Sequence, residues 1–309
     1  MLVNVTGKTY RESFETDPHP FISDRFIETN KHKVDEVVRL VAEHEKVAMG
    51  LVGGIIENTL KSPISAPFGG FHFLSNQIYT GEIDRFTDLL KSYIVERGLK
   101  KVEIKLPPDI YNLSFNAKTV NSLLRGGFLM SIPEITQWVD LEHFAGVYSS
   151  GSARTKYNQA IKNGLSFSAI SDSESKQCAY ELIRQNRIDF NRPIYMTYDE
   201  LEEVNKLWPV DYFQVADRAD KMVASAILYR GHEKIIQAIF WADNESGRSL
   251  RAMDFCLINL WNHYKKLGYN FIDIGISTEY GIPNEGLIRF KETHEAFSSA
   301  RFSFSWSPE

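Results

Sequence analysis

The feature of this sequence that most restricts its fold is a pattern of elements that occurs twice, about 170 residues apart. The first copy has a glycine at Gly98, a strand-like run over 102–106 and a phenylalanine at Phe128. The second copy has Gly268, an apolar run over 271–276 and Phe297 at the matching positions. In both copies one helical pattern precedes the glycine and another separates the strand from the phenylalanine. We therefore interpret the chain as two copies of one α/β unit.

Each copy has antiparallel strands first, then a long helix, a strand, a second helix and a final strand. This order predicts an α/β (α+β) fold in which each half forms a mixed, largely antiparallel sheet flanked by helices. We place the domains at 1–150 and 151–309, with the polar, basic helix expected over 151–164 as the hinge. Apolar spacing over 34–42 predicts a further helix near the start.

Composition restricts the classes of function. The chain of 309 residues is 43% hydrophobic and 24% charged, which is typical of a globular protein with two domains. A net charge of -5 opposes nonspecific nucleic-acid binding, so no DNA partner is expected. No apolar run is long enough to cross a membrane and no signal core precedes the first domain, which predicts a cytoplasmic protein. Histidines lack metal-ligand spacing and Cys178 and Cys256 fit core positions, so no metal site is expected.

Three stretches carry a resemblance to a known fold. They read ARTKYNQAIKNG over 153–164, NFIDIGISTEYG over 270–281 and GLIRFKETHEAF over 286–297. With the duplicated order of elements, they resemble the Fem-type aminoacyltransferases and the GNAT N-acyltransferase superfamily. The resemblance covers roughly 46–306. One departure is the absence of the glycine that the family usually has near 295–296, in the turn before the last strand.

The resemblance implies an acyltransferase that moves an acyl or aminoacyl group from a thioester or ester donor to an amine. The acceptor would be a small molecule, such as a sugar-derived, polysaccharide or peptidoglycan-type precursor. Acyl-CoA or acetyl-CoA is the favoured co-substrate. Aminoacyl-tRNA is less favoured because the sequence lacks a long charged heptad segment. The alternative is a non-catalytic binding or scaffold protein that keeps the duplicated fold.

The resemblance places a phosphate-binding turn at the start of the long helix in the second half. A helix N-terminus binds phosphate through its free N–H groups and its dipole. The sequence there is NESGRS over 244–249. The expected cofactor-binding residues are Gly247, Arg248, Ser249 and Arg251. An ordinary strand-to-helix turn with a serine N-cap explains the same residue types.

Four residues are candidates for the chemistry: Asp273, Glu279, Tyr280 and Lys291. By resemblance, Lys291 would contact the donor or stabilise a developing oxyanion. Asp273 or Glu279 would take a proton from the attacking amine, and Tyr280 would donate one to the leaving group. The alternatives are a solvated Lys291 and an Asp273 that pairs with a basic residue of the following helix.

A last group of candidates would hold the acceptor. In the second half, Arg154 and Tyr157 of the basic helix would bind a phosphate-bearing substrate, and Glu285 lies at the mouth of the strand. From the first half, Ser65, Phe68 and Phe71 would line the cleft wall. A solvated helix face is the alternative on the basic helix, favoured more for Lys156 than for Arg154. Tight core packing is the alternative for the stretch SAPFGGF over 65–71.

Overall fold

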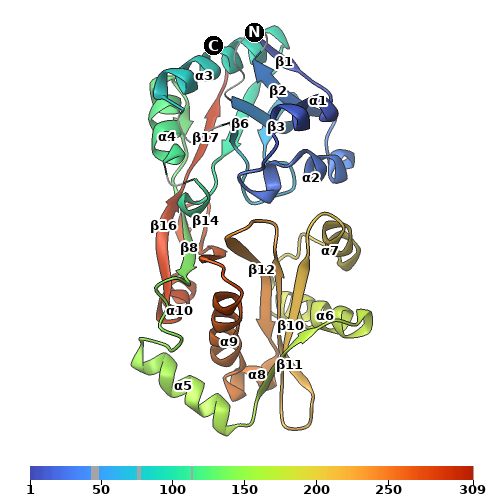
Figure 1. Cartoon of the computed structure of the whole chain (residues 1–309), viewed down its shortest axis with the longest axis vertical. Helices are drawn as coiled ribbons and strands as arrows, with labels where there is room; N and C mark the ends of the chain where they lie inside the picture. The colour runs from blue at the N-terminus through green and yellow to red at the C-terminus, as the bar shows by residue number, and fades with distance from the viewer. Residues whose placement is uncertain (43–48, 75–77, 113, 309) are drawn as a thin grey trace. The chain divides into compact units, whose positions relative to one another are not determined.

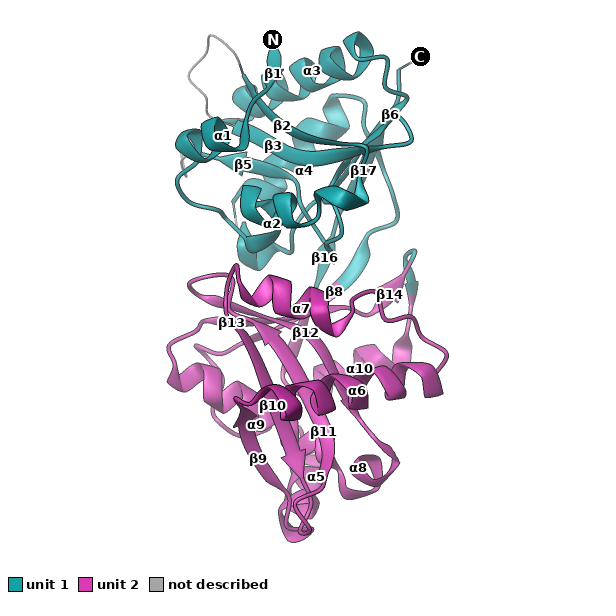
Figure 2. Ribbon diagram, turned by 90° about the vertical axis from the view of Figure 1, so that its right-hand side faces the viewer, with its two compact units in different colours: residues 1–135, 280–282, 299–309 teal, residues 136–279, 283–298 magenta. Residues whose placement is uncertain are grey.

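The computed structural model describes residues 1–42, 49–74, 78–112 and 114–308, which divide into two compact units (Figure 2). Unit 1 comprises Met1–Ile135, Tyr280–Ile282 and Ser299–Glu309, and unit 2 comprises Thr136–Glu279 and Pro283–Ser298. These bounds differ from the domains expected at 1–150 and 151–309. Each half contributes its final strand to the sheet of the other half, so the units exchange short segments.

Unit 1 is built on a sheet with the strand order β1-β2-β3-β4-β6-β17-β7, in which β5 also pairs with β3. Its strands are β1 (Leu2–Asn4), β2 (Glu36–Ala42), β3 (Met49–Ile56), β4 (Thr59–Ser62), β5 (Phe71–Phe73), β6 (Lys101–Lys105), β7 (Leu129–Met130) and β17 (Ser303–Trp306). Its helices are α1 (Gly7–Ser13), α2 (Asp24–Thr29), α3 (Thr80–Glu96) and α4 (Phe115–Arg125). Strand β4 runs parallel to β6, whereas β2, β3 and β17 pair antiparallel with their neighbours. Side chains of α3 and of the central strands share one buried core.

Strand β2 corrects the expectation of a helix over 34–42. Val38 and Leu40 are fully buried on one face of the sheet, and the strand pairs with both β1 and β3. Because Val41 is buried on the opposite face, apolar residues follow no simple alternation and the spacing imitates a helix. The β-branched valines fit a strand that is covered on both faces.

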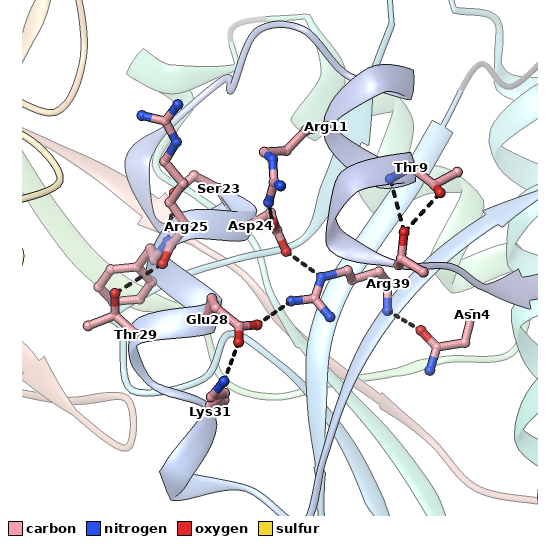
Figure 3. A network of polar contacts seen from close by, with 12 residues as sticks. Asn4, Thr9, Arg11, Ser23, Asp24, Arg25, Glu28, Thr29, Lys31 and Arg39 are labelled. Carbon is pink, nitrogen blue, oxygen red and sulfur yellow. Dashed lines mark hydrogen bonds and ion pairs between the residues drawn. The ribbon is translucent and has the colours of Figure 1, made fainter.

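A network of charges fastens the first helices of unit 1 to β2 (Figure 3). The Asp24 carboxylate, 3% exposed, accepts hydrogen bonds from Arg11 of α1 and from Arg39 of β2. Arg39 also donates to Glu28 at 2.8 Å. A side chain at Gly7 would come within 2.7 Å of the Asp24 carboxylate, so the close approach of α1 requires glycine. The network joins two helices and a strand through one buried carboxylate.

Unit 2 is built on a sheet with the strand order β16-β8-β13-β12-β11-β10-β9. Its strands are β8 (Glu134–Asp140), β9 (Ser166–Ile170), β10 (Val210–Ala216), β11 (Met222–Tyr229), β12 (Ile235–Asp243), β13 (Phe271–Ile276) and β16 (Ala296–Arg301), with the short β14 (Thr278–Glu279) and β15 (Ile282–Pro283) beyond β13. Its helices are α5 (Gly151–Lys162), α6 (Ser173–Asp189), α7 (Tyr198–Asn205), α8 (Glu245–Leu250), α9 (Ala252–Lys266) and α10 (Glu285–Thr293), labelled in Figure 1. Strand β12 runs parallel to β13, whereas strands β9 to β12 pair antiparallel in sequence.

Helices cover the sheet of unit 2. The fully buried Trp261 of α9 packs in one core with Ala224 and Ala226 of β11. Between them in sequence, Ser225 donates a hydrogen bond to the Ala179 carbonyl of α6 at 3.1 Å. Because successive residues of a strand point to opposite faces, α9 and α6 cover opposite faces of this sheet.

The two units repeat each other in detail. Helices α3 and α9 end at Gly98 and Gly268, both with a positive φ, of 63° and 83°. At each end, the N–H of the next residue bonds a carbonyl five residues back, at 3.0 Å for Leu99 and 3.1 Å for Tyr269. The following strands β6 and β13 each run parallel to an earlier strand of their own sheet. The predicted fold class, two mixed sheets flanked by helices, is confirmed.

Two local expectations are wrong. The long helix expected in the second half is divided, because Arg251 adopts a left-handed φ of 66° between α8 and α9. Cys178 is exposed on α6, whereas Cys256 is buried in the core. Within the described residues, no group of three or more His, Cys, Asp or Glu side chains could hold a metal ion. Of the helices in that same part of the chain, none has the length and apolar character needed to cross a membrane.

Candidate functional site

A cleft of unit 2 opens where two parallel strands separate. Strand β12 pairs with β13 only from Ile235 to Gln237. The register of β12 then shifts at Ile239, which is the mark of a β-bulge. Beyond this point residues 238–243 of β12 and 274–276 of β13 line a cleft of about 800 Å³. Helices α5, α6, α8, α9 and α10 supply side chains to its walls.

The walls of the cleft carry an excess of positive charge. Its lining cations are Lys156, Arg187, Arg192, Arg248, Arg251 and Lys291. Its lining carboxylates are Asp243 and Asp254. Such a concave, cationic surface attracts anions and orients their charged groups. Burial raises the pKa of Asp243 to about 6, against the opposing charge of Arg248.

Lys291 of α10 satisfies the backbone of β13 at the point where this strand leaves β12. Its side chain is 3% exposed, and Nζ donates to the carbonyls of residues 274, 275 and 276 at 2.7, 2.9 and 3.1 Å. Buried carbonyls without donors destabilise a protein, so Lys291 replaces a missing strand partner. Burial lowers the pKa of Lys291 to about 7, although the nearby Asp273 opposes this shift.

A buried carboxylate–imidazole pair lies at the start of α9. Asp254 lines the cleft, and its Oδ1 atom is 3.0 Å from His294 Nε2 and 3.9 Å from Lys156 Nζ. The other imidazole nitrogen, Nδ1, is 2.6 Å from the Phe290 carbonyl. A carboxylate in the first turn interacts favourably with the positive end of a helix. Asp254 therefore supplies negative charge at the position where a phosphate was expected.

Two arginines at the end of α6 also face the cleft. Arg187 belongs to the last turn of the helix and Arg192 follows it by five residues. Neither forms an ion pair with any residue in the described part of the chain. Burial and the charge of Arg192 lower the pKa of Arg187.

Comparison with known proteins identifies the fold. No family model matches the chain, and no curated protein sequence matches it. The structure is similar to that of FemX, with a TM-score of 0.70 and 11% identity, over 100% of this chain and 97% of FemX. The chain has a tandem GNAT fold. It shares this fold with L-PGS from Bacillus licheniformis, at a TM-score of 0.59 and 13% identity over 96% of this chain and 90% of that one.

A tandem GNAT protein from the clavulanic acid biosynthesis pathway gives a TM-score of 0.58 at 9% identity, covering 100% of this chain and 99% of that chain. The resemblance to the Fem-type and GNAT proteins is therefore confirmed for the fold. At this level of identity the likeness concerns architecture alone, and function has to be argued from the site.

Of the catalytic residues predicted within unit 2, Lys291 alone lines the cleft of this GNAT fold. It is buried, so the alternative of a solvated lysine is wrong. Asp273 is 1% exposed; its Oδ1 accepts from the Gly275 N–H at 2.9 Å and its Oδ2 lies 3.5 Å from Gln237 Nε2. Glu279 is exposed in β14. Tyr280 belongs to unit 1 and is 85% exposed.

The residues predicted to form the phosphate-binding turn fall into two groups: some have a structural role and others line the cleft. Asn244, rather than a serine, caps α8 by accepting the Gly247 N–H at 2.9 Å. A side chain at Gly247 would come within 2.2 Å of the Val223 carbonyl, so packing against β11 accounts for this glycine. Neither Gly247 nor Ser249 lines the cleft.

Arg248 and Arg251, which the sequence predicted as cofactor-binding residues, do line the cleft. Arg248 Nη1 lies 3.5 Å from Asp243 Oδ1, which partly compensates its charge. Arg251 stands at the junction of α8 and α9, where its left-handed backbone turns the chain into the longer helix. The turn therefore directs arginine side chains, rather than a glycine-rich backbone, toward the cleft.

On the basic helix α5, the sequence favoured Arg154 over Lys156 as a binding residue, and the cleft shows the opposite preference. Lys156 lines the cleft, whereas Arg154 is exposed and does not. Ala153 and Ala160 are buried and fix which side of α5 faces the core. The Tyr157 ring stacks on Phe255 with 5.8 Å between ring centroids, so it serves packing.

None of the remaining candidates lines this cleft. Phe68 and Phe71 are 1% and 2% exposed and belong to the packed interior of unit 1, as the alternative of tight core packing predicted. Ser65 is exposed in unit 1, where it accepts a hydrogen bond from Lys33 at 3.0 Å. Glu285 is exposed at the first position of α10 and does not line the cleft.

The missing glycine before the last strand has a structural substitute. Glu295 adopts a φ of 74°, the left-handed conformation that a glycine adopts without strain. Its carboxylate accepts hydrogen bonds from the Ser149 N–H at 2.6 Å and the Ser149 hydroxyl at 2.8 Å. The turn is therefore kept, although the glycine of the family pattern is absent.

Proposed function

We propose that this chain is an acyltransferase that moves an acyl or aminoacyl group from a phosphate-bearing thioester or ester donor to an amine. The observation that carries the proposal is the cationic cleft where β12 separates from β13. Its volume of about 800 Å³ lies within the range of ordinary ligand sites. The fold adds architectural support, because FemX, L-PGS and GNAT proteins share it.

The backbone of β12 suits a donor with an extended, amide-containing arm. Residues 238–243 pair with β11 on one edge and face the cleft on the other. An extended ligand can bind such an edge by main-chain hydrogen bonds, as an added strand does. The arm of an acyl-CoA has this character, which is why we favour acyl-CoA over an aminoacyl-tRNA ester as donor.

The chemical step needs an acceptor for a proton. The amine nitrogen attacks the donor carbonyl, the new C–N bond forms, and the C–S or C–O bond breaks as its electron pair leaves with sulfur or oxygen. The proton released by the amine requires a base near the reacting atoms. The cleft offers Asp243, with its pKa raised to about 6, and Asp254, which is held by His294. Sugar-derived or cell-wall-type amines are the acceptors that we would screen first.

A thermal-shift titration with acetyl-CoA and longer acyl-CoA tests the proposal. Binding to the folded state raises the unfolding midpoint, by the equivalent of about 2.7 kcal/mol when the ligand is at 100 times its Kd. A saturable rise followed by thiol release on addition of an amine supports a thioester-dependent transferase. Absence of any rise with acyl-CoA and with aminoacyl-tRNA contradicts it.

A non-catalytic binding protein is the second candidate. The observation that favours it is that Lys291 directs its N–H groups to three carbonyls of β13, while Asp273 is buried outside the cleft lining. Such a protein would bind the donor and release no thiol with any amine. Stopped-flow detection of thiol release separates the two functions.

A further inference from the structure

The end of α6 has a backbone arrangement that holds two arginines side by side. The N–H of Asn191 bonds the Ile188 carbonyl at 2.9 Å, and the N–H of Arg192 bonds the Arg187 carbonyl at 2.8 Å. Asn191 has a left-handed φ of 51°. This pair of bonds is the Schellman motif, which folds the chain back so that its first and sixth residues meet.

The residue types at these two positions are unusual. The first and sixth residues of a Schellman motif frequently form an apolar contact, yet here both are arginines that line the cleft. Two positive charges held together repel each other, and the partial burial of the unpaired Arg187 costs further free energy, whereas Arg192 is exposed. The favourable interaction of one cation with a helix C-terminus is small. Helix stability therefore does not explain the pair.

The structure gives this pair no protein counterion. Among the residues that are described, no carboxylate lies within ion-pair distance of Arg187 or Arg192. The Nε atom of Arg187 is buried and has no hydrogen-bond partner in the same part of the chain. Arg184, one turn earlier on the same helix, shows the ordinary case: it is partly exposed and pairs with Glu181 at 2.6 Å.

The neighbouring residues fix the pair in the cleft. Asn186 donates to the Asp243 carbonyl at 2.8 Å, which ties α6 to the end of β12. The Arg248 guanidinium lies 5.3 Å from the centre of the Phe190 ring, between the two arginines in sequence. Arg248 has Asp243 as a partial counterion, whereas Arg187 and Arg192 have none in the described chain. The end of α6 thus carries uncompensated positive charge.

We propose that Arg187 and Arg192 form a subsite that binds a phosphate group of the donor. Guanidinium groups form paired, charge-assisted hydrogen bonds with phosphate oxygens, and one phosphate can receive bonds from both side chains. The inference rests on the proposed function, because it names the part of the cleft that holds the anionic end of the donor. The α9 N-terminus has the Asp254 carboxylate instead.

If the two arginines form this subsite, replacing one of them should have opposite effects on the stability of the protein and on phosphate binding. Without phosphate, replacing one arginine by glutamine removes the repulsion, so the variant should unfold at the same temperature as the wild type or a higher one. With phosphate, the variant loses the bonds that the pair donates. A merely structural arginine would instead lower the unfolding temperature when it is replaced.

The test uses inorganic pyrophosphate as the probe, at constant ionic strength, in calorimetric and thermal-shift titrations of the full chain. The variants are Arg187→Gln, Arg192→Gln and the double replacement, with Arg184→Gln as the matched control on the same helix. We expect saturable binding to the wild type and to the control. For each single variant we expect the affinity to fall by about tenfold or more. Equal affinity of the double variant and the wild type, or no saturable binding to the wild type, overturns the subsite.

Coenzyme A and a short single-stranded RNA ending in CCA then distinguish the two sources of the phosphate. Binding of coenzyme A that depends on the arginine pair assigns the subsite to a thioester donor. Equivalent dependence for the RNA assigns it to an ester donor. Arginine-dependent pyrophosphate binding without acyl transfer from either donor upholds the subsite and refutes the proposed function. Acyl transfer with unchanged donor affinity in the double variant refutes the subsite alone.

Discussion

Replacement of Lys291 by methionine tests how the separated end of β13 is stabilised. Methionine has a similar length and is apolar, but it donates no hydrogen bond. The three carbonyls that Lys291 bonds, at 2.7 to 3.1 Å, would remain buried without this donor. A buried polar group without a partner costs about 1–3 kcal/mol. We therefore expect Lys291→Met to lower the free energy of unfolding by at least about 1–3 kcal/mol at pH 7.

The pH dependence of this loss follows from the pKa of Lys291. Burial lowers that pKa from 10.5 to about 7 in the folded protein, so between these values the unfolded chain binds more protons than the folded one. Stability therefore rises with pH in this window and falls as pH drops through 7. For one group the gain between pH 7 and 9 is about 2 kcal/mol. The variant lacks this gain, so its deficit should grow by that amount.

Urea unfolding followed by tryptophan fluorescence provides the assay. Four of the five tryptophans, at 138, 208, 241 and 261, belong to unit 2, so the signal reports mainly on the unit that contains Lys291. Curves would be measured at pH 6, 7, 8 and 9 for the wild type and Lys291→Met. Lys266→Met is the control, because it removes a lysine from an exposed position of α9. A deficit that stays constant from pH 7 to 9 would refute the conclusion that burial dominates the titration of Lys291.

Three other replacements test separate features. Gly247→Ala places a methyl group within 2.2 Å of the Val223 carbonyl, so calorimetry should show a loss of about 1–3 kcal/mol, and wild-type stability would contradict the packing role. Asp24→Asn leaves Arg39 without its buried partner and should cost about 3 kcal/mol in urea unfolding; an unchanged midpoint would show that the network is dispensable. Arg248→Glu should weaken acyl-CoA binding more than tenfold in calorimetry while the apo unfolding temperature stays nearly constant, and unchanged affinity would remove Arg248 from the donor site.

The sequence predicts the fold well because the repeat constrains many elements at once. Gly98 and Gly268 end matching helices, and each is followed by a strand parallel to an earlier one. The failure at 34–42 has a physical cause, since a strand covered on both faces loses the alternation that distinguishes it from a helix. The separation of β12 from β13 coincides with the bulge at Ile239, and the sequence analysis predicted neither.

The site was predictable only in part. Arg248, Arg251 and Lys291, which the resemblance singled out, line the cleft, and each follows a motif fixed to a helix end. Residues that meet through long-range contacts were missed, such as Asp254 and His294, which are 40 positions apart. One signal could have been used: an arginine, a helix-ending asparagine and a second arginine follow one another at the spacing of a Schellman motif over 187–192.

The exchange of final strands between the halves has a consequence for synthesis on the ribosome. Strand β17 pairs with β6 on one side and with β7 on the other, so Phe304 faces Ile104 across 200 positions of sequence. The sheet of unit 1 is therefore incomplete until residues 303–306 have been translated. During that interval β6 presents an open edge, and open edges template association between nascent chains. Because the two copies exchange strands, neither a simple truncation nor separate expression of one half would give complete sheets.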